Sequence, residues 1–204
     1  MNDVSALSTR RATCPRPASV RGFTLLEVLV SILVLSIGVM GMVGLQAASL
    51  QANRDARFQS SAVRLATELG DMMRGNKDIA IQTSATANPY LIDYTGTLPS
   101  ATACMATGCT STLAVAQSEM LGWLKRIQGS STAPGELPTS RVKVCFDTSP
   151  YDASGLPQWA CTDDGDTVVI KIGWLRSTAS ASAPATLNLN RPAVVMPVVP
   201  GSPT

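Results

Sequence analysis

The sequence predicts an α+β protein in which one long N-terminal helix packs on a small antiparallel sheet. The sheet belongs to a globular part of the chain, the head. An apolar run covers residues 23–45, and the next 29 residues contain no proline and place apolar side chains at helical spacing. A second amphipathic segment covers residues 111–128. Two later segments, residues 141–146 and 167–174, are rich in β-branched residues and alternate in part, as strands do.

Composition limits the possible function classes. The chain has 204 residues, with 16 Lys and Arg against 14 Asp and Glu, and no histidine. The absence of histidine removes Ser/His/Asp and Cys/His nucleophilic machinery and His-containing zinc sites. No Gly-rich phosphate loop or paired catalytic carboxylates are visible, and a formal net charge of +2 gives no case for phosphate-backbone binding. We therefore expect no enzyme, no cofactor, no metal and no nucleic-acid partner.

Charge and hydropathy are concentrated at the N-terminus. Residues 1–22 hold four arginines and one acid, whereas the remaining 182 residues hold 12 basic and 13 acidic side chains. The apolar run that follows makes the mean hydropathy of the whole chain positive, at +0.18. As a helix rising 1.5 Å per residue, residues 23–45 cover roughly the 30 Å hydrocarbon core of a bilayer. The run could be a signal peptide cut near residues 47–49, a plain anchor with cytoplasmic arginines, or a more specialised segment.

Glu27 separates these alternatives because it is the only charged residue in the apolar run. A carboxylate near the centre of a bilayer costs about 2.5–3.5 kcal/mol, and less near the interface. Neither a signal peptide nor a plain anchor requires this cost. Glu27 is therefore a candidate functional residue.

A short motif accounts for the basic leader and for Glu27 together. It reads Arg21-Gly22-Phe23-Thr24-Leu25-Leu26-Glu27. This motif resembles the processing site of type IV pilins and type II secretion pseudopilins. The resemblance implies cleavage between Gly22 and Phe23 by a membrane-embedded prepilin peptidase and N-methylation of Phe23. It also implies that Glu27 meets the N-terminal amine of an adjacent subunit during assembly.

The predicted long helix follows the cleaved leader, residues 1–22, and has two functional halves. Residues 23–45 form the transmembrane and filament-core half, and residues 46–74 form the half that packs on the head. Apolar residues of this second half share one face, and Gly75 with Asn76 forms a stop signal. The face comprises Ala62, Leu65, Ala66, Leu69, Met72 and Met73. The first half would protrude from the head, and the whole helix would be about 78 Å long.

Three glycines, Gly38, Gly41 and Gly44, recur near the end of the apolar run. Glycine costs about 1 kcal/mol relative to alanine in a helix, which favours a soft or locally unwound segment. Small residues also allow another helix to approach closely. The sequence leaves these two interpretations open.

The rest of the predicted head extends to residue 176. A connector followed by a helix occupies residues 75–129, and antiparallel strands occupy residues 140–176, with a possible short strand at 158–161 between them. The acidic sequence 163–166 contains Asp-Gly, a tight-turn signal, which we favour over a cation site.

Cysteine positions predict an exported head. Cys14 would be lost with the leader, leaving Cys104, Cys109, Cys145 and Cys161. Four cysteines allow three pairings, and proximity together with the strand positions favours Cys104–Cys109 and Cys145–Cys161. Their spacing does not fit the close pairs of a zinc site. Disulfides persist in the periplasm, where we place the head.

Residues 177–204 form a Pro-rich tail with no expected regular structure, although residues 191–199 could follow a sheet edge. The apolar residues 194–199 could dock on the head, contact a partner or be disordered.

Further similarities narrow the resemblance to the PilV family of minor pilins, the type IV pilus modification proteins. They comprise the sequences at 44–47 and 72–76 and the close cysteine pair that precedes a Trp-containing helix. The implied protein is a single-pass inner-membrane and pilus subunit of a Gram-negative bacterium. It would join other minor pilins and the major pilin at the inner-membrane assembly platform, prime pilus assembly, and support twitching motility and adhesion. The alternatives are a type II secretion minor pseudopilin and a DNA-uptake pilin.

Overall fold

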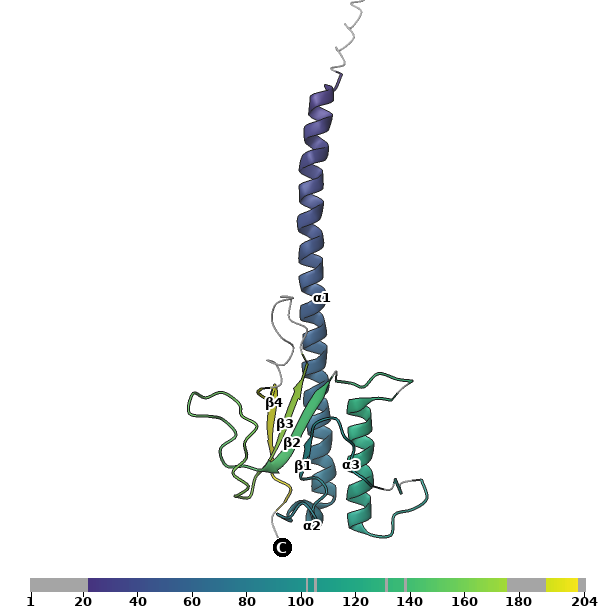
Figure 1. Cartoon of the computed structure of the whole chain (residues 1–204), viewed down its shortest axis with the longest axis vertical. Coiled ribbons are helices and arrows are strands. Elements are labelled where there is room, and N and C mark those ends of the chain that lie inside the picture. Colours follow the sequence, from purple (N-terminus) through teal and green to yellow (C-terminus); the bar gives the residue numbers. More distant parts are fainter. Residues whose placement is uncertain are drawn as a thin grey trace, which may run out of the picture. The chain divides into compact units, whose positions relative to one another are not determined.

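The computed structural model describes residues 22–101, 103–104, 106–130, 132–137, 139–175 and 190–201. Its elements, in chain order, are α1 (Leu25–Gly75), α2 (Lys77–Ala80), β1 (Ile92–Tyr94), α3 (Thr112–Gln128), β2 (Ser140–Phe146), β3 (Val168–Trp174) and β4 (Val194–Val198) (Figure 1). This is the α+β class expected from the sequence. Two compact units divide the chain at residues 45 and 46, within α1.

In the first unit the described structure is the beginning of α1. The helix starts at Leu25, two residues after the start expected from the sequence, and its side chains up to residue 45 are all exposed. The absence of proline allows an unbroken helix through this apolar segment. Residues 1–21 of the predicted leader, including Cys14, lie outside the described residues.

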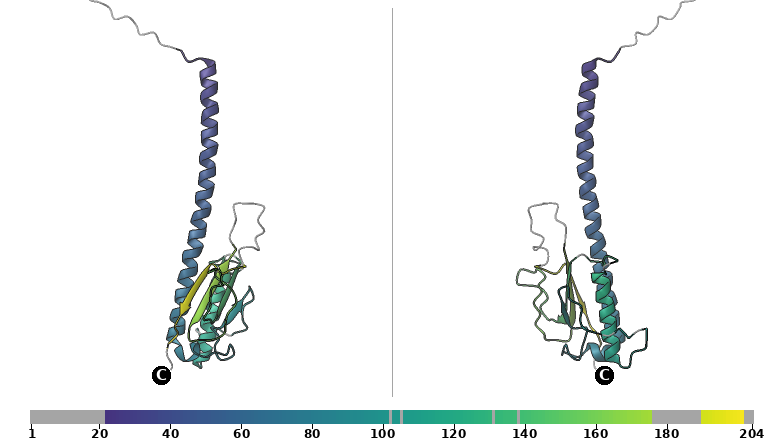
Figure 2. Two further views of the ribbon diagram at one scale, coloured as in Figure 1. Left: turned by 90° about the vertical axis from the view of Figure 1, so that its left-hand side faces the viewer. Right: turned by 45° about the vertical axis from the view of Figure 1, so that its right-hand side comes forward.

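In the second unit, α1 and α3 form one layer and the sheet forms the other, with the apolar core between them (Figure 2). Five of the six predicted core residues of α1 are buried, and Met72 is partly buried against the core. The indole N–H of Trp123 in α3 donates to the carbonyl of Leu65 in α1 at 3.0 Å, which ties the two helices together. Ser111 caps α3 by accepting from the N–H of Ala114 at 3.1 Å.

The sheet has the order β1-β2-β3-β4, and all neighbours are antiparallel. Its central pair is β2 and β3, in a register that opposes Val144 to Ile170 and Val142 to Ile172. These four side chains are buried, so the period-2 alternation of the two strands places one apolar face on the helices.

The connector contains structure that the sequence did not reveal. We interpreted this part of the chain only as a connector, but it contains β1, which pairs with β2. Asn88 is fully buried and organises this region, because its amide donates to the carbonyls of Ala80 at 3.0 Å and Gln82 at 2.8 Å. Its side-chain oxygen accepts from the N–H of Tyr90 at 3.1 Å. The short strand is thus fixed by tertiary contacts rather than by a local pattern.

The tail also forms a strand, which corrects the expectation of no regular structure and matches the sheet-edge alternative. β4 pairs with β3, and the side chain of Val198 packs against α1 at Gly70, where an added Cβ would lie 3.2 Å from Val198 Cγ2. Pro197 is tolerated because it sits on an edge strand. Residues 176–189 and 202–204 of the tail region lie outside the described residues.

The possible strand at residues 158–161 is not formed. The loop between β2 and β3 contains only an isolated bridge between Tyr151 and Pro157.

Candidate functional site

The first candidate site is the start of α1, where Gly22, Phe23 and Thr24 precede the helix. Thr24 is its N-cap. The Thr24 carbonyl accepts from the N–H groups of Glu27 and Val28, at 3.1 and 3.3 Å, and its Oγ1 accepts from the N–H of Glu27 at 3.2 Å. Threonine is favoured at this position because its hydroxyl satisfies an N–H that has no partner within the helix. The backbone therefore changes from non-helical to helical immediately after Thr24.

Glu27 lies in the first turn of α1 and is exposed. A negative charge at this position is favoured by the positive end of the helix dipole, which offsets part of the cost of a carboxylate in an apolar segment. Glu27 and Phe23 line one hollow on the side of the helix, together with Val28, Ser31, Ile32 and Leu35. Within the described chain its carboxylate forms no ion pair, so it is available to a cationic group.

The apolar residues on either side of Glu27 are exposed to an unusual degree for a helix of a folded protein. Leu25 is 91% exposed and Met40 is 81% exposed. The helix is long and apolar enough to cross a membrane. The hydroxyls of Ser31 and Ser36 each donate at 2.7 Å to the carbonyl four residues earlier, so their donors are satisfied within the helix. This segment and the head disulfides fit membrane anchoring with the head outside the membrane.

The three glycines near the end of the run have open surroundings, since nothing lies within 4 Å of a Cβ built at Gly38, Gly41 or Gly44. α1 is continuous through them.

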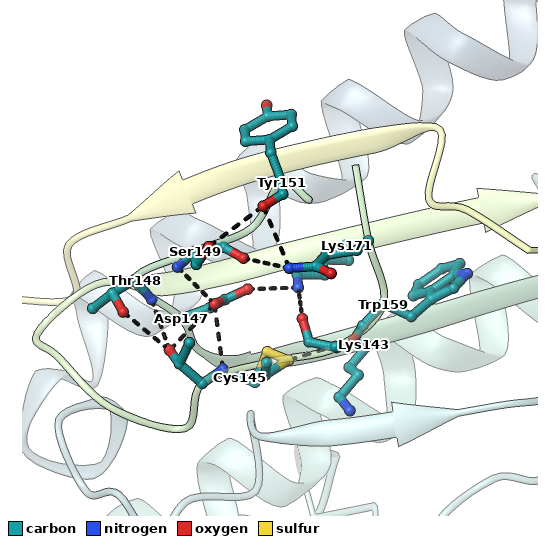
Figure 3. A network of polar contacts seen from close by, with 12 residues as sticks. Lys143, Cys145, Asp147, Thr148, Ser149, Tyr151, Trp159 and Lys171 are labelled. Atoms are coloured by element: carbon teal, nitrogen blue, oxygen red, sulfur yellow. Dashed lines mark hydrogen bonds and ion pairs between the residues drawn. A yellow bond between two sulfur atoms is a disulfide. The ribbon is translucent and has the colours of Figure 1, made fainter. Parts of the chain in front are cut away.

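The second candidate region lies on the side of the sheet where β2 leads into the β2–β3 loop (Figure 3). Disulfides join Cys145 to Cys161 and Cys104 to Cys109, the two pairs favoured by the sequence. The Cys145–Cys161 bond attaches the loop to β2. The Cys104–Cys109 bond closes a small loop in the connector.

A buried ion pair that was not predicted from the sequence lies beside the Cys145–Cys161 disulfide. Lys171 Nζ is 2.6 Å from Asp147 Oδ2, both side chains are fully buried, and Lys171 also donates to the carbonyl of Ala160. Asp147 Oδ1 accepts from the N–H groups of Ser149 at 2.9 Å and Thr162 at 3.3 Å. Burial acts to raise the pKa of Asp147, but the hydrogen bonds from Lys171 and Ser149 outweigh it and lower the pKa. A lysine within an otherwise apolar strand was the available signal.

This region does not offer a metal site. Ligand atoms of Cys145, Asp147 and Cys161 lie within 4.8 Å of one another, but both sulfur atoms are in a disulfide and the carboxylate is paired with Lys171. The acidic sequence that follows is a hydrogen-bonded loop. Asp164 Oδ1 accepts from the hydroxyl of Thr148 at 2.9 Å, and Gly165 adopts a positive φ of 83°.

Comparison with known families locates the first site within a recognised motif. The family model described as the prokaryotic N-terminal methylation motif matches residues 18–43. No curated protein and no solved structure matches the chain. The motif supports a type IV pilin-like protein, that is, a pilin or pseudopilin processed by prepilin peptidase, and the long helix with its antiparallel sheet is consistent with the pilin fold.

Proposed function

We propose that this chain is the precursor of a minor type IV pilin. The observation that carries the proposal is the methylation motif over residues 18–43, which coincides with the start of an exposed apolar helix. Prepilin peptidase cleaves the bond between Gly22 and Phe23, and Phe23 is N-methylated. The mature subunit then begins one residue before the N-cap of α1.

The membrane stage follows from the distribution of charge and apolar surface. The arginine-rich leader remains on the cytoplasmic side, as the positive-inside rule requires, and the apolar half of α1 crosses the inner membrane. The head folds in the periplasm, an oxidising compartment in which the disulfides Cys104–Cys109 and Cys145–Cys161 persist.

Glu27 acts at the assembly stage. A subunit that leaves the bilayer for a pilus carries this carboxylate into an apolar helical core, where burial without a cation is costly. The N-terminal amine at Phe23 of an adjacent subunit supplies the cation. Such a pair mainly gives register, because its attraction is largely offset by the loss of hydration.

The minor role rests on the resemblance of the stem sequences and the connector cysteines to PilV. The subunit joins other minor pilins and the major pilin at the inner-membrane assembly platform, where it primes or enters the pilus. Twitching motility and adhesion depend on the pili that result.

Mass spectrometry of the protein from sheared pili and from membranes tests this proposal. The expected result is an N-methylated Phe23 terminus in both fractions, with a small copy number in pili and with fewer pili and reduced twitching when the protein is deleted. An intact leader in every fraction would refute the processing. Normal pili together with defective type II secretion would instead assign the chain to a pseudopilin complex.

A further inference from the structure

The bond proposed for cleavage lies immediately before the first turn of α1. Gly22 and Phe23 are outside the helix, and Thr24 marks its boundary through the hydrogen bond from the Glu27 N–H to Thr24 Oγ1 at 3.2 Å. Phe23 precedes the cap and Val28 follows it by four positions, and both line the same hollow. Phe23 and Val28 thus occupy the two positions, one before the N-cap and four after it, at which apolar residues often pair and fix the direction of chain entry into a helix.

The position of this boundary decides whether the carbonyl of Gly22 is engaged. In an α-helix each N–H donates to the carbonyl four residues earlier, so a helix extended towards the leader would bond the N–H of Leu26 to the carbonyl of Gly22. The first four N–H groups of any helix lack internal partners, and next to a hydrocarbon phase an unsatisfied N–H is especially costly. Without its cap, α1 would therefore extend upstream, so that its first N–H groups donate to the carbonyls of earlier residues.

From this geometry we infer that Thr24 is a positioning residue for leader cleavage. Its hydroxyl fixes the start of α1 at Leu25 and leaves the carbonyl of Gly22 outside the helix, where a peptidase can bind it. The inference rests on the proposed processing. In that hydrolysis, the oxygen of a water adds to the carbonyl carbon of Gly22 and the bond to the Phe23 nitrogen breaks. Gly22 retains the new carboxylate, and both protons of the water pass to the Phe23 nitrogen, which becomes an ammonium group.

Three variants of the full-length precursor separate the cap from direct recognition of threonine. Thr24→Val keeps the branched shape without the hydroxyl, and Thr24→Asn changes the shape but restores a strong N-cap. Ser36→Ala removes a hydroxyl that bonds within α1 away from the cap, and it serves as the matched control. Each is incubated with prepilin peptidase in membranes, and the appearance of the Phe23 terminus is followed by mass spectrometry.

We expect Thr24→Val to slow cleavage by about fivefold, the factor that corresponds to the loss of about 1 kcal/mol from an N-cap. Thr24→Asn and Ser36→Ala should be cleaved at close to the normal rate. Cleavage of Thr24→Val at the normal rate would overturn the inference, and so would equally slow cleavage of Thr24→Asn and Thr24→Val. If the unaltered chain is not cut after Gly22, it is the proposed processing that fails.

A readout independent of the peptidase completes the test. The ¹³C chemical shift of the Gly22 carbonyl, measured on the precursor in detergent micelles, should move towards helical values in Thr24→Val and stay in place in Thr24→Asn. An unchanged shift in Thr24→Val would contradict the proposed extension of the helix.

Discussion

The ammonium group of Lys171 lies 2.6 Å from the carboxylate of Asp147, and neither side chain has any contact with solvent. Lys171 is in the centre of β3, whereas Asp147 immediately follows β2. The pair therefore fixes the start of the β2–β3 loop on the sheet, and the Cys145–Cys161 disulfide attaches a later part of the same loop.

Replacement of one partner should destabilise the head strongly. Lys171→Met leaves the buried carboxylate of Asp147 without its cation, which should cost about 3–5 kcal/mol in the free energy of unfolding. The measurement is denaturant unfolding of the full chain in detergent, followed by the fluorescence of the tryptophans, all of which are in the head. The double variant that adds Asp147→Asn should recover part of the loss, because the amide keeps an acceptor for Ser149 without a buried charge. A double variant less stable than Lys171→Met would contradict this account.

The same pair should make stability depend on acid pH. The pKa of Asp147 is lower in the folded protein than its ordinary value, so the folded state favours the charged form. Its contribution is complete above the unfolded pKa of about 3.9 and is lost as the pH falls through the folded pKa. Unfolding free energies measured between pH 7 and pH 2 should fall less steeply for Asp147→Asn than for the unaltered chain. Equal slopes would show that other carboxylates account for the acid sensitivity.

The two disulfides should differ in their contributions. Their sequence separations are 16 for Cys145–Cys161 and 5 for Cys104–Cys109. Loop-closure entropy predicts losses of about 3 and about 2 kcal/mol, respectively, when each pair is replaced by serines. Denaturant unfolding of the two double-serine variants provides the comparison, and a larger loss at Cys104–Cys109 would contradict the predicted order.

Two helical glycines should respond oppositely to larger residues. Gly70→Leu should destabilise the head by about 1–3 kcal/mol, because a Cβ at Gly70 already lies 3.2 Å from Val198 and further atoms must displace β4. Gly122 in α3 is exposed and has nothing within 4 Å of the corresponding position. Gly122→Ala should therefore stabilise the head by about 0.5–1 kcal/mol. The measurement is thermal or denaturant unfolding, and stabilisation by Gly70→Leu would rule out the close packing of β4 on α1.

The carboxylate of Glu27 should affect assembly rather than membrane insertion. Glu27→Ala and the matched Glu27→Gln both remove the charge that a neighbouring amine would meet, while the apolar helix remains. Both variants should fractionate normally with the inner membrane but be largely absent from sheared pili, as judged by quantitative immunoblotting. If either variant is incorporated into pili as well as the unaltered chain, the proposed role of the charge is refuted.

Much of the fold could be predicted because its main elements carry local patterns. α1, α3, β2 and β3 are long enough for helical or alternating periodicity to be clear. β1 has three residues, and its strand conformation depends on pairing with Val142 to Val144, which no local pattern encodes. β4 contains Pro197, and its strand conformation depends on the open edge of β3 and on the space above Gly70.

The two candidate sites also differ in how well a local sequence pattern predicts them. Gly22, Phe23 and Glu27 lie within one short segment, so their spacing is visible in the sequence. Asp147 and Lys171 are brought together only by the β2–β3 register and by the path of the intervening loop. The N-cap role of Thr24 required a helix boundary, which sequence periodicity places only to within a few residues.

The contact between β4 and α1 has a consequence for the timing of biogenesis. Thr67 and Met196 are 129 residues apart in the chain and yet face each other across this contact. The head core therefore remains open while the polypeptide is still being exported, and it closes only after β4 has emerged on the same side of the membrane. A chain that stops before residue 194 would leave this surface of α1 uncovered and open to proteases, so that incomplete chains would be removed before they could act.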